Sequence, residues 1–349
     1  MGLFLLKRLG VMALTAMVLT FVVFFLTNLQ PNLEKVAKFQ GNQRMTDAEV
    51  VSWIEKNGYG GPVVLRYAEW LGVYPGWRRV EEDGRIRGKC VKPGMEPEDI
   101  PRFCGLLQGD LGYSIVAKDE VVDIIGKRLA ASGVLMFWVM IVMVPMALLV
   151  GVLAGMREGS RTDRSLSTFA IVTTATPEYI SGVVLVVVFA SSVVGLKWFK
   201  GSAASAVNDG VTFDNFTLPV LTMALYGMGY IARMTRASMA EVMTAQYIRT
   251  ARLKGVSFRQ IVLKHALRNA LIAPFTVIML QFPWLLTGVV IVETLFNYKG
   301  FGWVLVLSAG NNDIDMLIAC SMAAVVVVLL TQLISDIGYV YLNPRIRIS

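Results

Sequence analysis

Residues Met239–Pro274 read MAEVMTAQYIRTARLKGVSFRQIVLKHALRNALIAP and form a basic segment in an otherwise apolar chain. The segments before and after it are both apolar enough to be membrane spans. Its cationic side chains are those of Arg249, Arg252, Lys254, Arg259, Lys264 and Arg268. The segment carries no grouping of catalytic side chains, so it predicts a docking surface for a soluble partner rather than a reaction centre.

The helical pattern of this segment is interrupted once, at Gly255. Glycine is the usual residue in the left-handed conformation that ends a helix. Ser257 follows as a candidate N-cap, and Gln260, three residues later, completes a capping box. We therefore expect a helix, a tight turn at Gly255 and a second helix, presented at a membrane face.

A DNA-binding helix-turn-helix has a similar size and charge and is the alternative interpretation of this segment. Both ends of the segment, however, continue directly into apolar stretches. Two flanking spans would hold the helices flat against the bilayer, so the docking of a protein is favoured.

The composition of the whole chain indicates a membrane protein. Of its 349 residues 55% are hydrophobic and 17% are charged, and the mean hydropathy is +0.59. A soluble domain carries about 25% charged residues. The net charge of +8 does not require a nucleic acid partner, because basic residues gather on the cytoplasmic loops of membrane proteins. We expect an all-α polytopic fold.

Six segments are predicted to cross the bilayer. Six spans place both termini and every short basic loop in the cytoplasm. Pro145 predicts a kink in the second span, and Pro177-Glu178 predicts an interruption of the third. The six segments are Leu9–Leu29, Leu129–Met156, Ser165–Leu196, Thr217–Ala232, Leu271–Val292 and Met316–Tyr341.

The first of these segments follows Lys7 and Arg8, as the apolar core of a signal peptide would. It is longer than the roughly 7–15 residues of such a core, and no small-x-small cleavage site comes after it. We therefore expect a retained span, with the long polar segment that follows it outside the cytoplasm.

Two runs in the basic segment, Tyr247–Gly255 and Lys264–Leu271, resemble the EAA loop of ABC-importer permeases. The resemblance is to the dipeptide/oligopeptide/nickel branch of binding-protein-dependent inner-membrane components, and to its B-type subunits. Gly255 stands at the glycine of the motif and Ala251 at its second alanine, whereas Arg249 replaces its glutamate. That replacement is usual in the peptide branch.

Shorter matches to the family follow in the expected order along nearly the whole chain. They are Trp70-Leu71-Gly72, Gly105–Ser114, Gly159-Ser160, Asp163-Arg164, Glu293–Phe296, Gly300-Phe301-Gly302 and Asn343–Arg347. Residues Val73–Cys104 separate two pieces that usually lie closer together, so this stretch is interpreted as an insertion. Cys90 and Cys104 lie inside it or at its edge, where they form either a disulfide or two free thiols in an oxidising compartment.

The resemblance implies a type I ABC importer permease fold of six transmembrane helices, with a large extracytoplasmic loop between the first two. On this interpretation residues 1–29 are the first span and residues 30–128 are a periplasmic loop with the inserted segment 73–104. A five-helix permease core, 129–341, contains the coupling loop 239–270, and a cytoplasmic tail, 342–349, closes the chain.

The resemblance also implies the function. The chain would form, with a homologous second permease, the translocation path for peptides or peptide-like solutes. Two ATPase subunits would dock on the cytoplasmic loops, and an extracytoplasmic solute-binding protein would deliver the cargo. Oligosaccharides, opines and nickel are alternative cargoes within the family. The residues implied in coupling to the ATPases are Arg249, Ala251, Arg252, Lys254, Gly255, Val256 and Ser257.

The sequence shows no ATP site of its own. The nearest approach to a phosphate-binding loop is Gly126-Lys127, but Arg128 follows it and Val121 stands where the first glycine should be. ATP and Mg are therefore expected on the partner subunits, and we expect neither a catalytic residue nor a metal site in this chain.

Two polar residues within the predicted spans, Glu178 and Gln281, are candidates for the translocation path. Ionisable groups at membrane depth are costly and usually face a cavity or a partner. Glu178 is interpreted either as a contact for a cationic peptide amino terminus or as a solvated residue at the helix break after Pro177. Gln281 has the same two interpretations, with packing favoured. Glu293 is interpreted as an interfacial or paired structural acid rather than a transport group. His265, the only histidine, is a pH sensor or a ligand on one interpretation, and packing or a hydrogen bond is the favoured one.

A secondary transporter and a membrane-embedded enzyme are the alternative classes of membrane protein. A secondary transporter usually shows paired repeats with broken helices, and no tandem repeat is visible in the sequence. A membrane-embedded enzyme needs a cluster of histidine, aspartate or serine side chains at matching depth, and none is apparent. An ABC permease is therefore the favoured interpretation.

Overall fold

The computed structural model describes residues 2–81, 86–91, 95–192 and 195–342. The predicted tail, 342–349, lies outside these residues except for Leu342. The chain divides into two compact units. The core unit comprises Leu129–Trp303 and the segment from Val327 onward, and the N-terminal unit comprises Gly2–Arg128 and Val304–Val326. Each unit is described by itself below.

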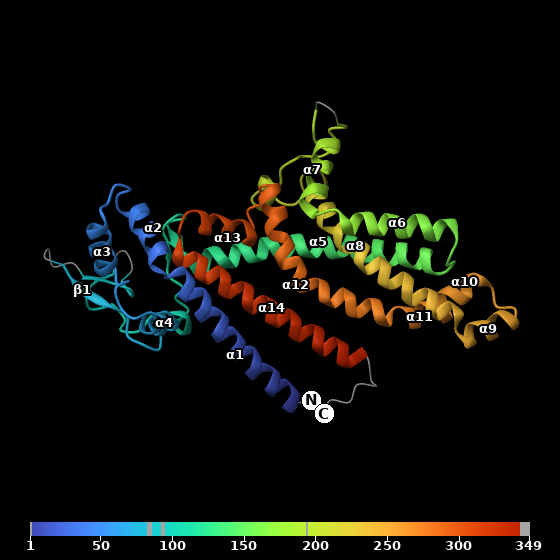
Figure 1. Cartoon of the computed structure of the whole chain (residues 1–349), viewed down its shortest axis with the longest axis horizontal. Helices are drawn as coiled ribbons and strands as arrows, with labels where there is room; N and C mark the ends of the chain where they lie inside the picture. The colour runs from blue at the N-terminus through green and yellow to red at the C-terminus, as the bar shows by residue number, and fades with distance from the viewer. Residues whose placement is uncertain (1, 82–85, 92–94, 193–194, 343–349) are drawn as a thin grey trace. The chain divides into compact units, whose positions relative to one another are not determined.

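Four helices are long and apolar enough to span a membrane. They are α1 (Gly2–Thr27), α5 (Val121–Gly155), α12 (Ile272–Leu295) and α14 (Ile314–Leu342) (Figure 1). The pair α6 (Arg161–Ala175) and α7 (Glu178–Phe189) gives a fifth span if its two halves count as one. The structure therefore supports four or five spans among the described residues, and the six-span count stays a prediction.

The predicted span Thr217–Ala232 lies within α8 (Phe213–Thr244), which is less apolar than the other long helices. Its buried residues are spread along most of its length, from Asn215 to Met243. A helix enclosed by other helices contacts protein rather than lipid, so it does not need an apolar surface all round. This explains why α8 does not pass a test based on apolarity alone.

The predicted interruption at Pro177 is confirmed. Helix α6 ends at Ala175, Thr176 is extended with φ −86° and ψ 120°, and α7 starts at Glu178 at an angle of 104° to α6. A residue before proline disfavours the helical conformation, which explains the extended Thr176. At Pro145, by contrast, α5 continues through the proline as one helix.

In the core unit, α8 packs against α6, α7 and α12. Helix α5 contributes Leu135, Val139 and Met143 to the same apolar core, and all three are fully buried. Three further elements complete this part of the chain: η2 (Ala204–Val207), the coupling segment described below, and the start of α13 (Phe301–Gly310).

A buried carboxylate fixes the turn between α12 and α13. Glu293 is fully buried and accepts hydrogen bonds from the Ser132 hydroxyl and from the Trp303 N–H, the latter at 3.0 Å. Ser132 in turn accepts a bond of 2.7 Å from the Phe301 N–H. A Cβ on Gly300 would lie 2.2 Å from Glu293 Oε1, so only glycine leaves room for this carboxylate. The structural interpretation of Glu293 agrees with these contacts.

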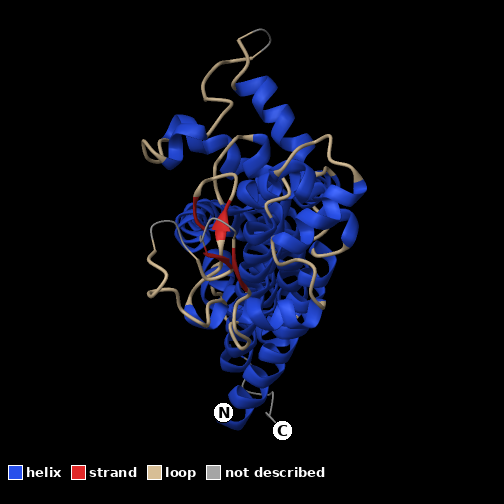
Figure 2. Cartoon of the chain, turned by 90° about the vertical axis from the view of Figure 1, so that its left-hand side faces the viewer, coloured by secondary structure: helices blue, strands red, loops and turns tan. Residues whose placement is uncertain are grey.

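The polar segment after α1 is a folded unit rather than an open loop. Its helices are α2 (Gln30–Gln40), α3 (Asp47–Lys56), α4 (Val63–Leu71) and the short η1 (Leu106–Gln108). Strands occur here as two hairpins, β1 (Arg78–Val80) with β2 (Ile86–Gly88), and β3 (Tyr113–Ser114) with β4 (Asp119–Glu120) (Figure 2). The expectation of a purely α-helical chain therefore misses these two small hairpins.

An aromatic cluster holds the N-terminal unit together. Phe24 of α1 lies against Tyr67 and Trp70 of α4, with ring centroids 5.4 and 6.2 Å away. Ile314 and Ile318 at the start of α14 belong to the same cluster. Apolar side chains from distant parts of the sequence thus bury one another in this cluster.

Residues 73–104, interpreted from the sequence as an insertion, contain the first hairpin. A disulfide joins Cys90 to Cys104 at the end of this segment, with the Cα atoms 5.5 Å apart. Residues 82–85 and 92–94 of the segment lie outside the described residues. The Gly76 N–H donates to the Arg102 carbonyl at 3.1 Å, and Arg78 donates to the Ile100 carbonyl at 2.8 Å. These bonds tie the ends of the segment together around the disulfide.

We expect replacement of both Cys90 and Cys104 by serine to lower the stability of the N-terminal unit by about 3 kcal/mol, the chain-entropy estimate for a loop of about 15 residues. Denaturant unfolding of the purified chain, followed by tryptophan fluorescence, measures this loss. Mass spectrometry of the unreduced protein provides the control. Free alkylation of both thiols in the native protein would contradict the disulfide.

Candidate functional site: the basic loop between α8 and α12

The basic segment forms four short helical pieces after α8. They are α9 (Gln246–Leu253), α10 (Phe258–Gln260), the π-helical η3 (Ile261–Ala266) and α11 (Leu267–Ala270). In Figure 1, α9 and α10 lie where α8 ends, and α11 leads back into α12. The predicted helix, turn and helix are therefore present, although the second helix is partly π-helical.

The turn between α9 and α10 is a Schellman motif. The Val256 N–H donates to the Ala251 carbonyl at 3.2 Å, and the Gly255 N–H donates to the Arg252 carbonyl at 3.0 Å. These are the two bonds that define the motif. Gly255 has φ +75°, so its predicted left-handed conformation is confirmed. No atom lies within 4 Å of a Cβ built on Gly255, so glycine is required here by the backbone and not by crowding.

The capping box predicted for Ser257 and Gln260 is wrong. Ser257 occupies the N-cap position with an extended backbone, φ −60° and ψ 145°, but its side chain accepts no cap hydrogen bond. Ser257 and Gln260 are both exposed. Water can satisfy the free N–H groups of an exposed first turn, so a side-chain cap is not needed there.

The inner face of the loop is an apolar cluster. Ile248 and Ala251 of α9 pack with Ile261, Val262 and Ala266 of η3. The cluster continues into Met239 and Met243 at the end of α8, and Val152 and Met156 of α5 pack against it. Buried apolar contacts therefore attach the loop to the two long helices α5 and α8.

The outer face carries exposed apolar and cationic side chains together. Leu253 is 83% exposed beside the turn, and Tyr247, Phe258 and Leu263 are exposed as well. The cations of the same face, Arg249, Arg252 and Lys254, are all exposed. We call this set of seven side chains the docking face. An apolar side chain as exposed as Leu253 on a short rigid element is typical of an interaction site.

Of the predicted coupling residues, Ala251 points inward and is buried, Val256 is half-buried, and the other five are exposed. The sequence interpretation missed Leu253, although a signal existed. Ile248 and Ala251 are three residues apart and mark the buried stripe of α9. Leu253 lies off that stripe, so its exposure could have been predicted.

His265 is exposed in η3, and its imidazole makes no hydrogen bond among the described residues, although its carbonyl accepts one of 3.4 Å from Asn269 Nδ2. The prediction that it is held by packing or a hydrogen bond is therefore wrong for this chain. It was inferred from the position of His265 in a helical motif, but the buried stripe of η3 passes through Ile261, Val262 and Ala266 instead.

A buried ion pair fixes α8 beside the end of α6. Asp163, with a side chain 4% exposed, accepts two hydrogen bonds from Arg236, at 3.0 Å from Nε and 2.8 Å from Nη2. It also accepts a bond of 2.9 Å from the Gly159 N–H. Arg157 of the same connection lies over the ring of Phe258, 5.5 Å from its centroid. The connection between α5 and α6 is thus joined both to α8 and to the docking face.

The two candidate path residues are both buried in the core unit. Glu178, 9% exposed, is the first residue of α7, and Gln281, 6% exposed, lies on the buried face of α12. A Cβ on Gly288 would be 3.3 Å from Glu178 Oε2, so the start of α7 lies close to α12. No hydrogen bond joins Glu178 to Gln281 within the described chain, so the structure does not bring them together as one polar pair.

Residues 147–348 match the family described as "Binding-protein-dependent transport system inner membrane component". The chain belongs to this family. It is a permease component of a binding-protein-dependent ABC transport system. The matched region contains α6, α7, α8, the docking face and all that follows, so it covers most of the core unit.

Named members of the family are similar over most of their length. The chain is 30% identical over 309 residues to the oligopeptide transport system permease protein AppB of Bacillus subtilis, covering 87% of each chain. It is 29% identical over 350 residues to the probable peptide ABC transporter permease protein y4tP of Sinorhizobium fredii, covering 99% of this chain and 100% of that protein. It is 34% identical over 241 residues to the glutathione transport system permease protein GsiC of Escherichia coli, covering 69% and 76%.

Among solved structures, one described as the "Crystal structure of an amino acid ABC transporter with histidines" is similar to this permease at a TM-score of 0.45 and 14% identity. The similarity covers 62% of this chain and 93% of that one.

We expect Asp163→Asn to destabilise the permease by about 2–3 kcal/mol. Breaking a fully buried ion pair costs roughly 3–5 kcal/mol, whereas an exposed pair contributes at most ~1 kcal/mol. We expect an intermediate loss because the Arg236 side chain is 32% exposed. Thermal unfolding in detergent measures the effect. Glu158→Gln is the matched control, since Glu158 lies 3.4 Å from the same arginine but is 56% exposed. Equal losses for the two variants would show that burial of Asp163 does not matter.

Proposed function

We propose that this permease imports peptides or peptide-like solutes and that the docking face is where ATPase subunits couple to it. The observation that carries the coupling role is the rigid turn at Gly255, which presents Leu253 and three cations on a base of buried apolar contacts. A partner that pushes or pulls on such an element moves α5 and α8 with it, because both helices pack beneath it.

The coupling has a thermodynamic requirement. Binding of ATP to a partner can shift the permease between inward-open and outward-open states only if its contacts differ between those states. In our proposal two ATPase subunits, which bind ATP and Mg, make those contacts on the docking face. The residues proposed for coupling remain Arg249, Ala251, Arg252, Lys254, Gly255, Val256 and Ser257, with Ala251 acting from the inner face and Leu253 added to the outer one.

The proposed assembly contains a homologous second permease and an extracytoplasmic solute-binding protein. The family description supports the solute-binding protein, since it names a binding-protein-dependent system. The cargo proposal rests on the names of the relatives, two of which are named for peptides or oligopeptides and one for glutathione. Oligosaccharides, opines and nickel are the alternative cargoes. Six spans with both termini in the cytoplasm would place the docking face on the ATPase side and residues 30–128 outside the cytoplasm.

Gly255→Leu tests the coupling proposal. A Cβ on Gly255 has no atom within 4 Å, so the positive φ is the main cost of a leucine there, about 1–2 kcal/mol. The permease should remain folded while ATPase docking weakens or ATP hydrolysis uncouples from import. Co-purification of the ATPases and import into proteoliposomes measure the two effects.

Two further variants sharpen this test. Gly255→Asn accepts the same left-handed backbone with a small side chain and should keep coupling better than leucine does. Leu253→Ser removes an 83% exposed apolar side chain and should weaken docking. Val80→Ser, at a position on β1 that is 67% exposed, should not. A Gly255→Leu permease that binds its ATPases and imports at the wild-type rate would rule out the coupling role.

We also propose that Glu178 and Gln281 face the translocation path of the assembled pair. Glu178→Gln removes the charge and keeps the shape, so import of cargo with a free amino group should fall by about tenfold, as for the loss of one charge-assisted hydrogen bond. Amino-acetylated cargo and basal ATP hydrolysis should be unaffected. If both kinds of cargo are imported equally by the variant, Glu178 has only a structural role.

A further inference from the structure

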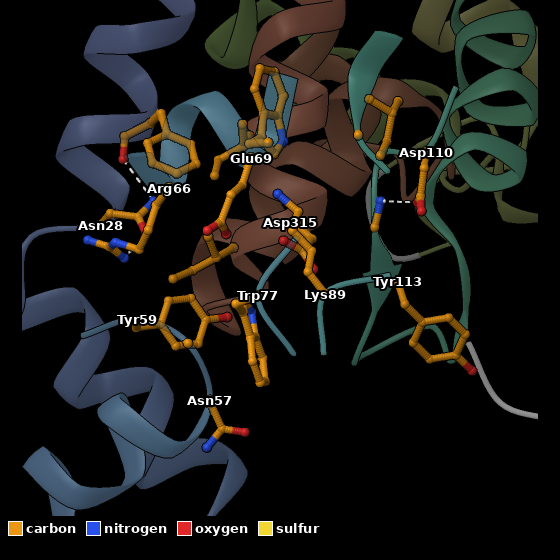
Figure 3. A pocket seen from close by; sticks show the side chains of 18 of the residues that line it. Asn28, Asn57, Tyr59, Arg66, Glu69, Trp77, Lys89, Asp110, Tyr113 and Asp315 are labelled. Atoms are coloured by element: carbon orange, nitrogen blue, oxygen red, sulfur yellow. Dashed lines mark hydrogen bonds between the residues drawn. The ribbon is translucent and has the colours of Figure 1, made fainter. Parts of the chain in front are cut away.

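The N-terminal unit contains a cavity of about 250 Å³ that the coupling and path residues do not explain. Its wall is formed by side chains of α1, α4, the first hairpin and the start of α14. Figure 3 shows Glu69, Lys89 and Asp315 directed toward its middle, with the Tyr59 hydroxyl pointing the same way. The wall therefore brings both signs of charge into one small space.

Part of the polar wall is already satisfied by the protein. Arg66 donates to Asn28 Oδ1 at 2.7 Å and to the Gly61 carbonyl at 3.1 Å. Asp110 accepts the Gly112 N–H at 3.0 Å. These groups hold the wall together and have less capacity for a ligand.

Two donors on the wall are not satisfied. The indole N–H of Trp70 finds no acceptor among the described residues, and Trp70 is only 4% exposed. A buried N–H without an acceptor costs about 1–3 kcal/mol and is rare in native proteins. The Lys89 ammonium lies in the field of Asp315, Glu69 and Asp110, yet it has no hydrogen bond or ion pair within 4 Å among the described residues. Of the two, only the Lys89 ammonium can meet an anionic oxygen in the cavity, because the Trp70 nitrogen has no surface accessible from it.

Burial disfavours the charged forms of two side chains on this wall, Lys89 and Glu69. It lowers the pKa of the Lys89 ammonium, which the nearby carboxylates only partly oppose. It also raises the pKa of the Glu69 carboxyl, despite the nearby Lys89 and Arg66. A ligand that brought the opposite charges to these two groups would relieve both effects.

The inserted segment supplies one side of the cavity. Trp77 and Lys89 both belong to it and are linked by a hydrogen bond of 3.1 Å from the Lys89 N–H to the Trp77 carbonyl. Lys89 directly precedes Cys90, so the disulfide holds the backbone that carries this cation. The segment therefore places an aromatic ring and a cation on the cavity wall.

We propose that this cavity binds a small zwitterionic solute, such as an amino acid or a dipeptide. The ligand ammonium would lie at Glu69 and Asp315, beside the rings of Tyr59 and Trp77, and its carboxylate would accept bonds from the Lys89 ammonium. The volume is below the roughly 300–1,000 Å³ of sites for drug-sized ligands, which favours a small solute. The proposal concerns a site separate from the docking face and does not depend on the identity of the transported cargo.

The test is calorimetric titration of the purified full-length chain in detergent with the dipeptide alanylalanine. We expect saturable binding, and we expect it to weaken by about tenfold or more when the amino group is acetylated or the carboxylate is amidated, since each change removes a charge-assisted contact. This comparison uses only the native protein, so it does not depend on the folding of a variant. No transport partner is needed, so failure here would leave the proposed function untouched.

Two cavity variants test whether alanylalanine binds at the cavity wall. Lys89→Met and Asp315→Asn should each weaken binding of alanylalanine by about tenfold. Lys56→Met and Asp99→Asn are matched controls at exposed positions of the same unit and should bind as the native chain does. The absence of saturable binding at millimolar concentrations, equal binding of the blocked dipeptides, or undiminished binding by both cavity variants would overturn the proposal.

Discussion

The ion pair between Asp163 and Arg236 fixes the helix on which the rest of the core unit depends. Helix α8 runs without a break from Phe213 to Thr244, through the apolar core and into the base of the docking face. Two parallel hydrogen bonds to a buried carboxylate leave little freedom to rotate or slide α8 against α6. In our proposal, a displacement applied at the docking face is therefore passed to the packed helices as a rigid-body movement, which is the property a coupling element needs.

The permease handles its buried charges in two different ways. At Glu293 the protein itself satisfies the buried carboxyl group, with donors from Ser132 and Trp303 and a glycine that makes room for it. In the cavity of the N-terminal unit, Lys89, Glu69 and Asp315 share a half-buried space in which the Trp70 N–H finds no acceptor. A satisfied cluster stabilises a fold, whereas an incompletely satisfied one leaves interaction capacity for a ligand.

The sequence was sufficient for features that depend on neighbouring residues. Gly255 predicted a left-handed turn because few other residues tolerate that backbone, and Pro177 predicted the break between α6 and α7 because proline restricts the residue before it. The sequence was insufficient where exposure to solvent decides whether a side chain packs or forms a hydrogen bond. The capping box at Ser257 and the packing of His265 failed because both side chains are exposed, and exposure follows from how the helices fold together.

By itself, therefore, the sequence determined the helical membrane class, the basic loop between two apolar segments, its turn and the family to which the chain belongs. The tertiary structure alone decided which residues meet across long stretches of chain. Asp163 and Arg236 are 73 residues apart, and Ser132 and Glu293 are 161 apart. Local conformation is set by the sterics of a few adjacent residues, whereas such pairs form only when the packing of whole helices places two polar groups beside each other away from water.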